Sequence, residues 1–479
     1  MKHTDIIQKL NLEQKCALLS GETVFTTRAL PGKGIPAITL SDGPNGVRKQ
    51  AGAADHLGLN PSVPATCFPT SSATACSWDE KLGEAVGEAL GEEAAAQEVA
   101  VLLGPGLNIQ RSPLCGRDFE YFSEDPILAG RMAAAYVRGI QKNGISACPK
   151  HFAVNSQELR RMASDSVLDE RTLRELYLTG FEIVVKEAKP KTIMTSYNLI
   201  NGTYANENAH LLQDILRKDW GFDGAVVTDW GGSNDHALGV KNGSTLEMPC
   251  PGGDSIRELM KAVQDGKISE ADVDARLDEM LELVLSTHAA VEKAPRTFDA
   301  AAHHKLARRA AAESIVLLKN EGGILPLKPN EKLAVIGDFA ETPRYQGAGS
   351  SAVNALQVDT LLDSIKADDS GITFVGYASG FERQGAADAE KLEEAVALAK
   401  KADTVLLCLG LDELRESEGL DRSDMKLAEN QQQLLAAVAA VNPNVVVLMS
   451  AGAPVETPWV GQCRALVYGA LGGQAGAGA

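Results

Sequence analysis

A repeated order of short apolar segments and amphipathic segments in the first half of the chain constrains the fold most. The apolar segments, which we predict to be strands, cover residues 37–40, 101–103, 145–147, 192–195, 225–228 and 245–248. Between them, apolar residues recur at helical spacing, as Leu82, Val86 and Leu90 do. Continuously apolar strands that alternate with helices form parallel sheets. The pattern therefore predicts an α/β fold, with a (β/α)₈ TIM-like barrel over residues 1–290.

Local signals predict where two of these helices begin. Asp169 precedes an amphipathic segment that carries Leu173 and Phe181, and we expect it to cap that helix. We expect Asn206 to cap a helix over residues 210–220, which Gly221 ends.

The second half of the chain predicts a further α/β domain. A mixed-charge stretch with a proline marks a linker over residues 291–302, and a helix is expected at 304–314. Predicted strands follow at 333–336, 372–375, 404–409, 445–449 and 465–468, with helices at 386–400 and 429–441. We expect residues 303–479 to form an α/β sandwich with a mostly parallel open sheet. The Gly- and Ala-rich residues 472–479 close no domain, so we expect this one to be incomplete at its C-terminus.

Charge and cysteine content restrict the partners. There are 46 basic and 64 acidic residues, a net charge of −18, and such a field repels nucleic acid and anionic membranes. A small neutral substrate fits better, and a homo-oligomer is allowed. The eight cysteines form no Cys-x-x-Cys pair, and residues 1–7 show no apolar leader, so a cytoplasmic location is expected.

Polar and aromatic residues gather at the predicted strand ends, where barrel enzymes place their sites. They are Asp42, Lys150, His151, Met194, Tyr197, Asp229 and Trp230. Asp229 follows a buried strand, and a short carboxylate beside an aromatic ring suits attack on a sugar's anomeric carbon. Asp229 alone could equally cap the next turn. Arg117 and Arg161 add hydrogen-bond donors that suit sugar hydroxyls.

Two other kinds of site are disfavoured. The sequence has no His-x-x-x-His motif, no cysteine cluster and no paired aspartates at strand ends, so we expect no metal. The glycines of residues 347–351 do not match the Gly-x-Gly-x-x-Gly spacing of a dinucleotide site, so no cofactor is expected.

Several motifs resemble those of glycoside hydrolase family 3. They are Ser-Asp-Gly-Pro-Asn-Gly-Val-Arg at 41–48, Gly-Arg-Asp-Phe-Glu-Tyr-Phe-Ser-Glu-Asp-Pro at 116–126, Lys-His-Phe at 150–152, Met-Thr-Ser-Tyr-Asn at 194–198, Val-Thr-Asp-Trp at 227–230 and Glu-Ser-Glu-Gly-Leu-Asp-Arg at 416–422. They occur in family order over nearly the whole chain. The resemblance implies a retaining exo-acting β-glycosidase, with β-glucosidase as the expected activity.

The resemblance also implies residue roles. Asp229 takes the nucleophile's place, and Glu418, from the second domain, takes that of the acid/base. Asp42, Arg117, Lys150, His151 and Arg161 fall where the family grips the terminal sugar, with Arg48 close by and Met194, Tyr197 and Trp230 on the pocket wall. The residues alone do not select Glu418 from the acidic run 412–421, and Glu416 is the second choice. We expect cations to keep Asp229 ionised and a drier or carboxylate-rich surround to keep Glu418 protonated.

Three alternatives stay open or are disfavoured. β-Xylosidase or α-L-arabinofuranosidase activity of the same family fits the pocket residues, and a catalytically impaired sugar-binding fragment is a further reading. The family branch that acts on N-acetylhexosamines carries Pro-Gly-His after Lys-His-Phe. This chain has Ala153, Val154 and Asn155 after Phe152, which disfavours that branch.

Overall fold

Short parallel strands form a ring in the first part of the chain. The computed structural model describes residues 1–52 and 60–479. The ring contains β1 (Leu40–Asp42), β2 (Val101–Leu103), β3 (Ser146–Ala147), β5 (Thr192–Met194) and β8 (Ala225–Val227), paired in parallel as β1-β2-β3 and β5-β8. Single bridges join Phe152 to Thr195 and Val227 to Leu246. All three residues of β2 and of β8 are buried, as continuous apolar runs require.

The segment 19–27 closes this ring into a TIM-like barrel. Gly21 N donates to the Glu247 carbonyl, while Thr27 N donates to the Ile38 carbonyl beside β1. Four of the six predicted strands are confirmed within one residue, and the prediction of 37–40 overlaps β1 only at Leu40, because the strand begins three residues later. The sixth, 245–248, pairs only through the isolated bridges of Leu246 and Glu247.

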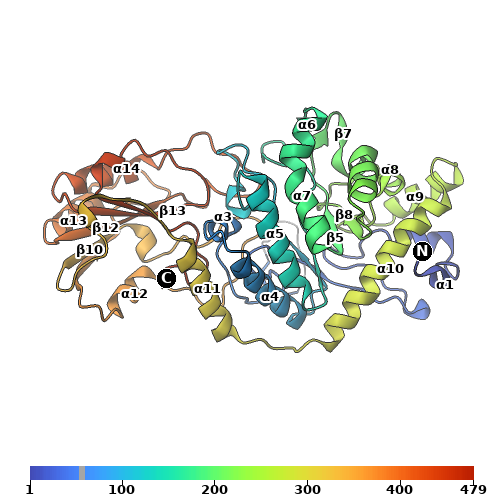
Figure 1. Ribbon diagram of the computed structural model, residues 1–479, viewed down its shortest axis with the longest axis horizontal. Helices are drawn as coiled ribbons and strands as arrows, with labels where there is room; N and C mark the ends of the chain where they lie inside the picture. The colour runs from blue at the N-terminus through green and yellow to red at the C-terminus, as the bar shows by residue number, and fades with distance from the viewer. Residues whose placement is uncertain (53–59) are drawn as a thin grey trace.

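Helices surround the barrel, as Figure 1 shows. They include α1 (Thr4–Ile7), α2 (Leu12–Ala17), α3 (Ser71–Ala75), α4 (Glu80–Ala96), α5 (Pro126–Gln141), α6 (Glu170–Thr172), α7 (Thr179–Ile183), α8 (His236–Asn242), α9 (Asp254–Gln264) and α10 (Glu270–Lys293). Wider helical turns at Leu173–Leu178, Val184–Ala188 and His210–Asp219 complete the set. A small outer sheet joins β4 (Asp165–Ser166), β6 (Leu199–Ile200) and β7 (Thr203–Tyr204).

One of the two predicted helix caps is correct. The Asp169 carboxylate accepts a hydrogen bond from Thr172 N, as expected. Asn206 does not cap the helix at 210–219, because its Oδ1 accepts from the hydroxyls of Thr195 and Ser244 instead. Asn208 is the residue that accepts from Leu211 N at that helix start.

The second part of the chain is a six-stranded sheet with the order β11-β10-β12-β13-β14-β9. β10 (Lys332–Ile336), β11 (Thr373–Ala378), β12 (Thr404–Gly410), β13 (Val445–Ser450) and β14 (Ala465–Tyr468) are parallel and confirm the five predicted strands. β9 (Val316–Asn320) was not predicted and pairs antiparallel at the edge. Figure 1 shows α13 (Ala389–Ala399) and α14 (Glu429–Ala439) on one side of this sheet and α12 (Leu361–Lys366) on the other.

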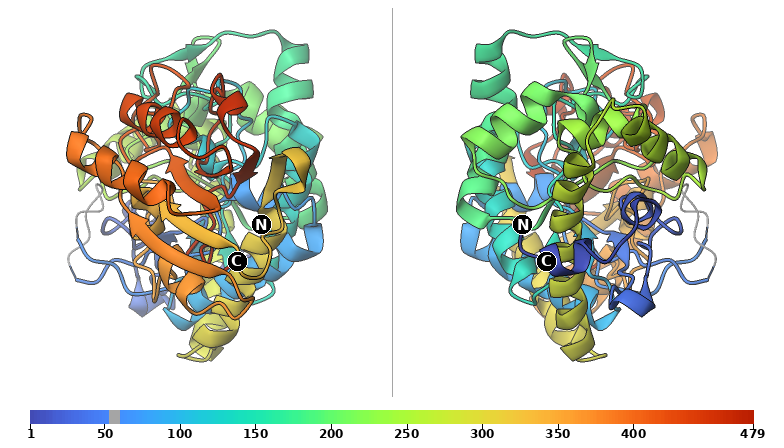
Figure 2. Two further views of the ribbon diagram at one scale, coloured as in Figure 1. Left: turned by 90° about the vertical axis from the view of Figure 1, so that its left-hand side faces the viewer. Right: turned by 90° about the vertical axis from the view of Figure 1, so that its right-hand side faces the viewer.

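The helix α11 (Ala300–Ser314) connects the two parts. Residues 294–299 lead into it from α10, and its Ala307 and Ala310 are buried in the core of the barrel part. The ring Nδ1 of His303 on α11 lies 2.7 Å from the buried carboxylate of Glu93 on α4. The two parts therefore share a packed boundary, and Figure 1 shows α11 between the sheet of the second part and α4. The left view of Figure 2 shows the second part, in orange and red, in front of the barrel part.

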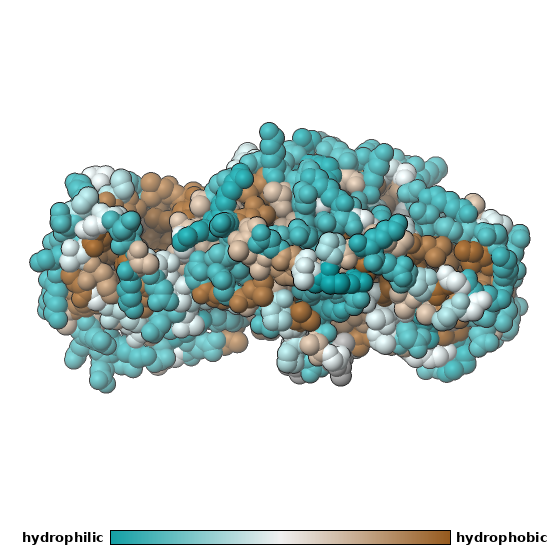
Figure 3. Space-filling view, turned by 90° about the horizontal axis from the view of Figure 1, so that it is seen from below, coloured by the Kyte–Doolittle hydropathy of each residue, from teal (hydrophilic) through white to brown (hydrophobic). Residues whose placement is uncertain are grey.

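The surface is largely polar. Seen from below, it is hollowed between the two parts, where apolar side chains gather (Figure 3). Leu317 and Leu318 of the edge strand β9 are 53 % and 60 % exposed. Across residues 1–52 and 60–479, no helix combines the length and apolarity needed to cross a bilayer.

Candidate active site

One cavity of about 400 Å³ collects side chains from both parts of the chain. Asp42 ends β1, Met194 ends β5, and Asp229 follows β8, so the carboxyl ends of the barrel strands form its floor. Ser350 and Glu418 reach it from loops of the second part. The full lining is Phe25, Asp42, Arg117, Lys150, His151, Arg161, Met194, Tyr197, Asp229, Trp230, Gly231, Pro249, Ser350 and Glu418.

Asp229 is rigidly held at the barrel end. Its Oδ1 accepts a hydrogen bond from Trp230 N at 2.7 Å, and its Oδ2 lies 3.7 Å from His151 Nε2. The side chain is only 12 % exposed. Burial raises the pKa of Asp229, although the positive charges of Arg161 and Arg117 oppose that shift.

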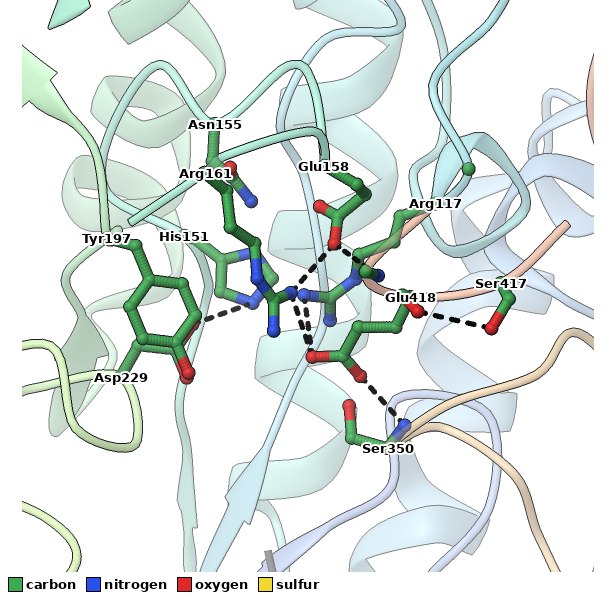
Figure 4. Close-up of polar contacts among 12 residues, drawn as sticks. Arg117, His151, Asn155, Glu158, Arg161, Tyr197, Asp229, Ser350, Ser417 and Glu418 are labelled. Carbon is green, nitrogen blue, oxygen red and sulfur yellow. Dashed lines mark hydrogen bonds and ion pairs between the residues drawn. The ribbon is translucent and has the colours of Figure 1, made fainter. Parts of the chain in front are cut away.

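Glu418 is held by three donors on the other side of the cavity. Its Oε1 lies 2.9 Å from Arg161 Nη1 and 3.4 Å from Arg117 Nη1, and its Oε2 accepts from Ser350 N at 2.8 Å. Figure 4 shows the two guanidinium groups between Glu418 and Asp229. Burial alone would raise the pKa of Glu418, but the two arginines and the Ser350 hydrogen bonds hold it below its ordinary value.

The ionisation expected for Glu418 from the sequence is wrong, because the pKa of this carboxyl group lies below its ordinary value. We expected Asp229 to be kept charged and Glu418 to be kept protonated. The arginines instead lie against Glu418 and stabilise its carboxylate, while burial is the largest influence on Asp229. The contacts with Arg117 and Arg161 therefore favour the ionised form of Glu418.

A buried cation cluster forms the wall beside Glu418. Arg117 is bidentate on Glu120, with Nε and Nη2 at 2.8 and 2.9 Å from its two oxygens. Lys150 Nζ also lies 3.3 Å from Glu120. This bidentate pairing fixes the Arg117 fork and leaves its Nη1 directed at Glu418. Glu120 was not among the predicted site residues, although a buried arginine three positions away called for such a partner.

His151 is neutral in this setting. Burial lowers its pKa well below the ordinary value, and the charges of Arg117, Lys150 and Arg161 lower it further. Its Nδ1 lies 3.1 Å from the Tyr121 hydroxyl, which orients the ring toward Asp229. A neutral imidazole in this place can donate or accept one hydrogen bond on the cavity side.

Two sequence-based choices fall outside the cavity. Arg48 does not line it; its Nη1 lies 3.9 Å from Asp42 and donates to the Ser350 carbonyl, so it supports two residues that do. Glu416, the second choice for the acid, is buried in the second part, where its Oε1 accepts from Gly452 N. Sequence reasoning missed Phe25, Gly231 and Pro249, because their chemistry carries no site signal, and left Ser350 without a role.

Trp230, Phe25 and Tyr197 give the cavity an aromatic side. The Trp230 ring packs against Phe25 with the ring centroids 5.4 Å apart and the planes tilted by 38°, and its Nε1 donates to the Val24 carbonyl. Tyr197 carries Arg161 over its ring at 4.7 Å. Aromatic faces beside charged hydrogen-bonding groups suit a ligand that, like a sugar, has both C–H faces and hydroxyl groups. Among the described residues, no group of three histidine, cysteine or acidic side chains is arranged to hold a metal ion.

Comparison with known proteins agrees with this geometry. The sequence profile of the glycosyl hydrolase family 3 N-terminal domain matches residues 48–283, and that of its C-terminal domain matches residues 315–479. The chain belongs to glycosyl hydrolase family 3. The crystal structure of a family 3 β-glucosidase from Bifidobacterium adolescentis is 42 % identical with a TM-score of 0.92, covering 98 % of this chain and 68 % of that one.

Relatives within family 3 differ in their substrates. The thermostable β-glucosidase B of Acetivibrio thermocellus is 45 % identical over 99 % of this chain and 63 % of its own length. An exo-α-(1→6)-L-arabinopyranosidase of Bifidobacterium longum is 44 % identical over 98 % of this chain and 63 % of its own length. The chain thus spans just under two thirds of these relatives' length.

The environment of Asp42 predicts an acidic limit to activity. Burial raises the pKa of Asp42 to about 6, against the opposing charges of Lys150 and Arg48. A protonated Asp42 loses its charge and half of its acceptor capacity for sugar hydroxyls. We therefore expect kcat/KM to fall below about pH 6, well above the range of an ordinary aspartate. The Asp42→Asn variant should have a lower kcat/KM at every pH, and its loss of activity on the acidic side should begin at a lower pH. An unchanged limb would assign it to another group.

Proposed function

We propose that this chain carries the catalytic centre of a retaining exo-β-glucosidase. The observation that carries the proposal is the joint cavity: Asp229 from the barrel and Glu418 from the second part line it, with buried cations between them. Asp229 is the nucleophile and Glu418 the acid/base. Asp42, Arg117, Lys150, His151 and Arg161 bind the hydroxyls of the terminal sugar, and Met194, Tyr197 and Trp230 form its wall.

The reaction proceeds by double displacement. A carboxylate oxygen of Asp229 attacks the anomeric carbon while Glu418 gives its proton to the glycosidic oxygen, which leaves as the aglycone alcohol. Water then attacks the glycosyl ester, Glu418 takes the proton from that water, and Asp229 leaves with its electron pair. The sugar is released with its configuration retained.

In this proposal, sugar binding loosens the contacts that lower the pKa of Glu418. Arg117 and Arg161 donate to sugar hydroxyl oxygens in this proposal and so contact Glu418 less closely. With its positive neighbours engaged elsewhere, the pKa of Glu418 rises from its depressed value, and the carboxyl group can take up a proton.

A cytoplasmic location stays a prediction.

A mechanism-based trap tests the proposal. Incubation with 2,4-dinitrophenyl 2-deoxy-2-fluoro-β-D-glucoside should inactivate the protein and add one sugar to the peptide that contains Asp229. We expect hydrolysis of p-nitrophenyl β-D-glucoside that gives β-glucose as the first product. Labelling of a different carboxylate, or release of α-glucose, would contradict the assignment.

A second candidate is cleavage of a pentoside, because the arabinopyranosidase relative is as similar as the glucosidase one. In their pyranose forms, xylose and arabinose lack the hydroxymethyl group that glucopyranose carries. Ratios of kcat/KM for p-nitrophenyl β-D-glucoside, β-D-xyloside, α-L-arabinofuranoside and α-L-arabinopyranoside separate the two. A higher kcat/KM for any of the pentosides than for the glucoside would favour the second candidate.

A further inference from the structure

The place of Glu418 depends on how one loop of the second part docks on the barrel. Asp229 is fixed to a barrel strand, whereas Glu418 lies in the loop 417–422. Gly116 shows how close the docking is, since a Cβ added there would lie 1.7 Å from the Leu420 carbonyl oxygen and 2.4 Å from that of Ser417. The two loops therefore touch through their backbones, where only a glycine fits.

Asp421 connects this loop to the barrel with a single carboxylate. Its Oδ1 accepts from Gly116 N at 3.1 Å and from Glu158 N at 2.9 Å, and its Oδ2 accepts from Leu159 N at 2.8 Å. Three backbone N–H groups from two barrel loops thus converge on one anionic group. Charge-assisted hydrogen bonds of this kind are about twice as strong as neutral ones.

Glu158 makes the reciprocal connection. Its side chain is fully buried, and its Oε2 accepts from Gly419 N of the second part at 2.8 Å. Arg161 Nη1 donates to the same Glu158 oxygen at 2.7 Å and to Glu418 Oε1 at 2.9 Å. Asp421 therefore anchors the loop after Glu418, and Glu158 anchors the residue next to it.

We propose that Asp421 and Glu158 form a clamp that positions the acid/base Glu418 over the barrel, and that they act through Glu418 without touching the substrate. The inference rests on the proposed function of Glu418. Asp229 keeps its place without the clamp, because β8 holds it. Loss of the clamp therefore impairs proton donation far more than nucleophilic attack, and a displacement near 1 Å can cost about 10²-fold in rate.

The Asp421→Asn variant tests this inference. The side-chain NH2 group of asparagine can donate but cannot accept a hydrogen bond from a backbone N–H group. At least one of the three hydrogen bonds is therefore lost. Asp424→Asn is the matched control, because Asp424 lies in the same region and its hydrogen bonds within the described part of the chain join it to Arg415, Ser423 and Lys426 of its own loop. Glu158→Gln serves as the second variant, since it weakens the Arg161 contact while its amide oxygen still accepts from Gly419 N.

The readout compares two leaving groups. Dinitrophenyl β-D-glucoside needs little acid assistance, whereas methyl β-D-glucoside needs a proton donor. We expect Asp421→Asn to lower kcat/KM for the methyl glucoside about 10²-fold and for the dinitrophenyl glucoside less than about fivefold. Asp424→Asn should leave both within about twofold. Equal losses on both substrates, as a general folding defect gives, would overturn the positioning role.

Hydrogen exchange separates this inference from the proposed function. In Asp421→Asn, peptides that contain Gly116, Glu158 and Gly419 should exchange faster than in the parent chain and in Asp424→Asn. Unchanged exchange would overturn the clamp even if activity fell. A parent chain that cleaves no β-glycoside, with exchange accelerated in the variant, would instead refute the proposed function and leave the docking contact supported.

Discussion

Replacement of Asp229 by asparagine is expected to lower kcat for every β-glucoside by at least about 10⁴-fold, because the amide cannot form the glycosyl ester. Asparagine has the same shape, and its Oδ1 can still accept the hydrogen bond that Trp230 N gives to Asp229. Steady-state rates on dinitrophenyl β-D-glucoside, with thermal melts of both proteins, measure the effect. The loss should be found with every leaving group, since attack by the nucleophile and departure of the aglycone belong to the same step.

A matched control is available six residues further along the chain. Asp235 is exposed and caps α8 through Leu238 N, outside the cavity. Because asparagine caps helices as well as aspartate does, Asp235→Asn should keep nearly full activity and an unchanged melting temperature. Residual activity of more than a few per cent in Asp229→Asn, after contaminating enzyme is excluded by trapping, would remove Asp229 from the nucleophile's role.

Buried parallel strands were predictable because burial on both faces leaves a continuous apolar signal. The run at residues 101–103 coincides with β2, and 465–468 coincides with β14. The edge strand β9 was missed, although residues 315–318 form a continuous apolar run of the same kind. Leu317 and Leu318 are exposed, so this run does not come from burial on both faces. Residues 245–248 have strand-like composition, but single bridges to neighbouring segments replace a regular ladder.

Contacts between distant residues account for the other errors. Asn206 looked like a helix cap, but Thr195 and Ser244, which are remote in sequence, occupy its side-chain oxygen. The strand-end rule located the barrel half of the cavity correctly, because the carboxyl ends of parallel strands meet at one face. It could not show that Arg161, placed by a loop, pairs with Glu418 from the other part of the chain. Ionisation depends on such pairings, and for this reason the expectation that Glu418 is held protonated was wrong.

Replacement of Glu418 by glutamine is expected to divide substrates by their leaving groups. Glutamine can keep the hydrogen bond from Ser350 N but has no proton to give. We expect kcat/KM for methyl β-D-glucoside to fall by about 10³-fold, within the range that general acids contribute. On dinitrophenyl β-D-glucoside, kcat/KM should fall less than about tenfold, while deglycosylation becomes slow and lowers kcat. Glu416→Gln should leave the ratio between the two substrates unchanged, because Glu416 does not face the cavity.

The depressed pKa of Glu418 makes this prediction sharper. The charges of Arg117 and Arg161 hold the pKa of Glu418 below its ordinary value. If sugar binding draws Arg117 and Arg161 away, binding of a glucose-like inhibitor must be accompanied by proton uptake. Calorimetry in buffers of different ionisation enthalpy measures that uptake, which should approach one proton in the parent chain near pH 6 and vanish in Glu418→Gln. Absence of uptake in the parent chain, combined with equal rate losses on both glucosides, would mean that Glu418 only holds the arginines and that the proton comes from elsewhere.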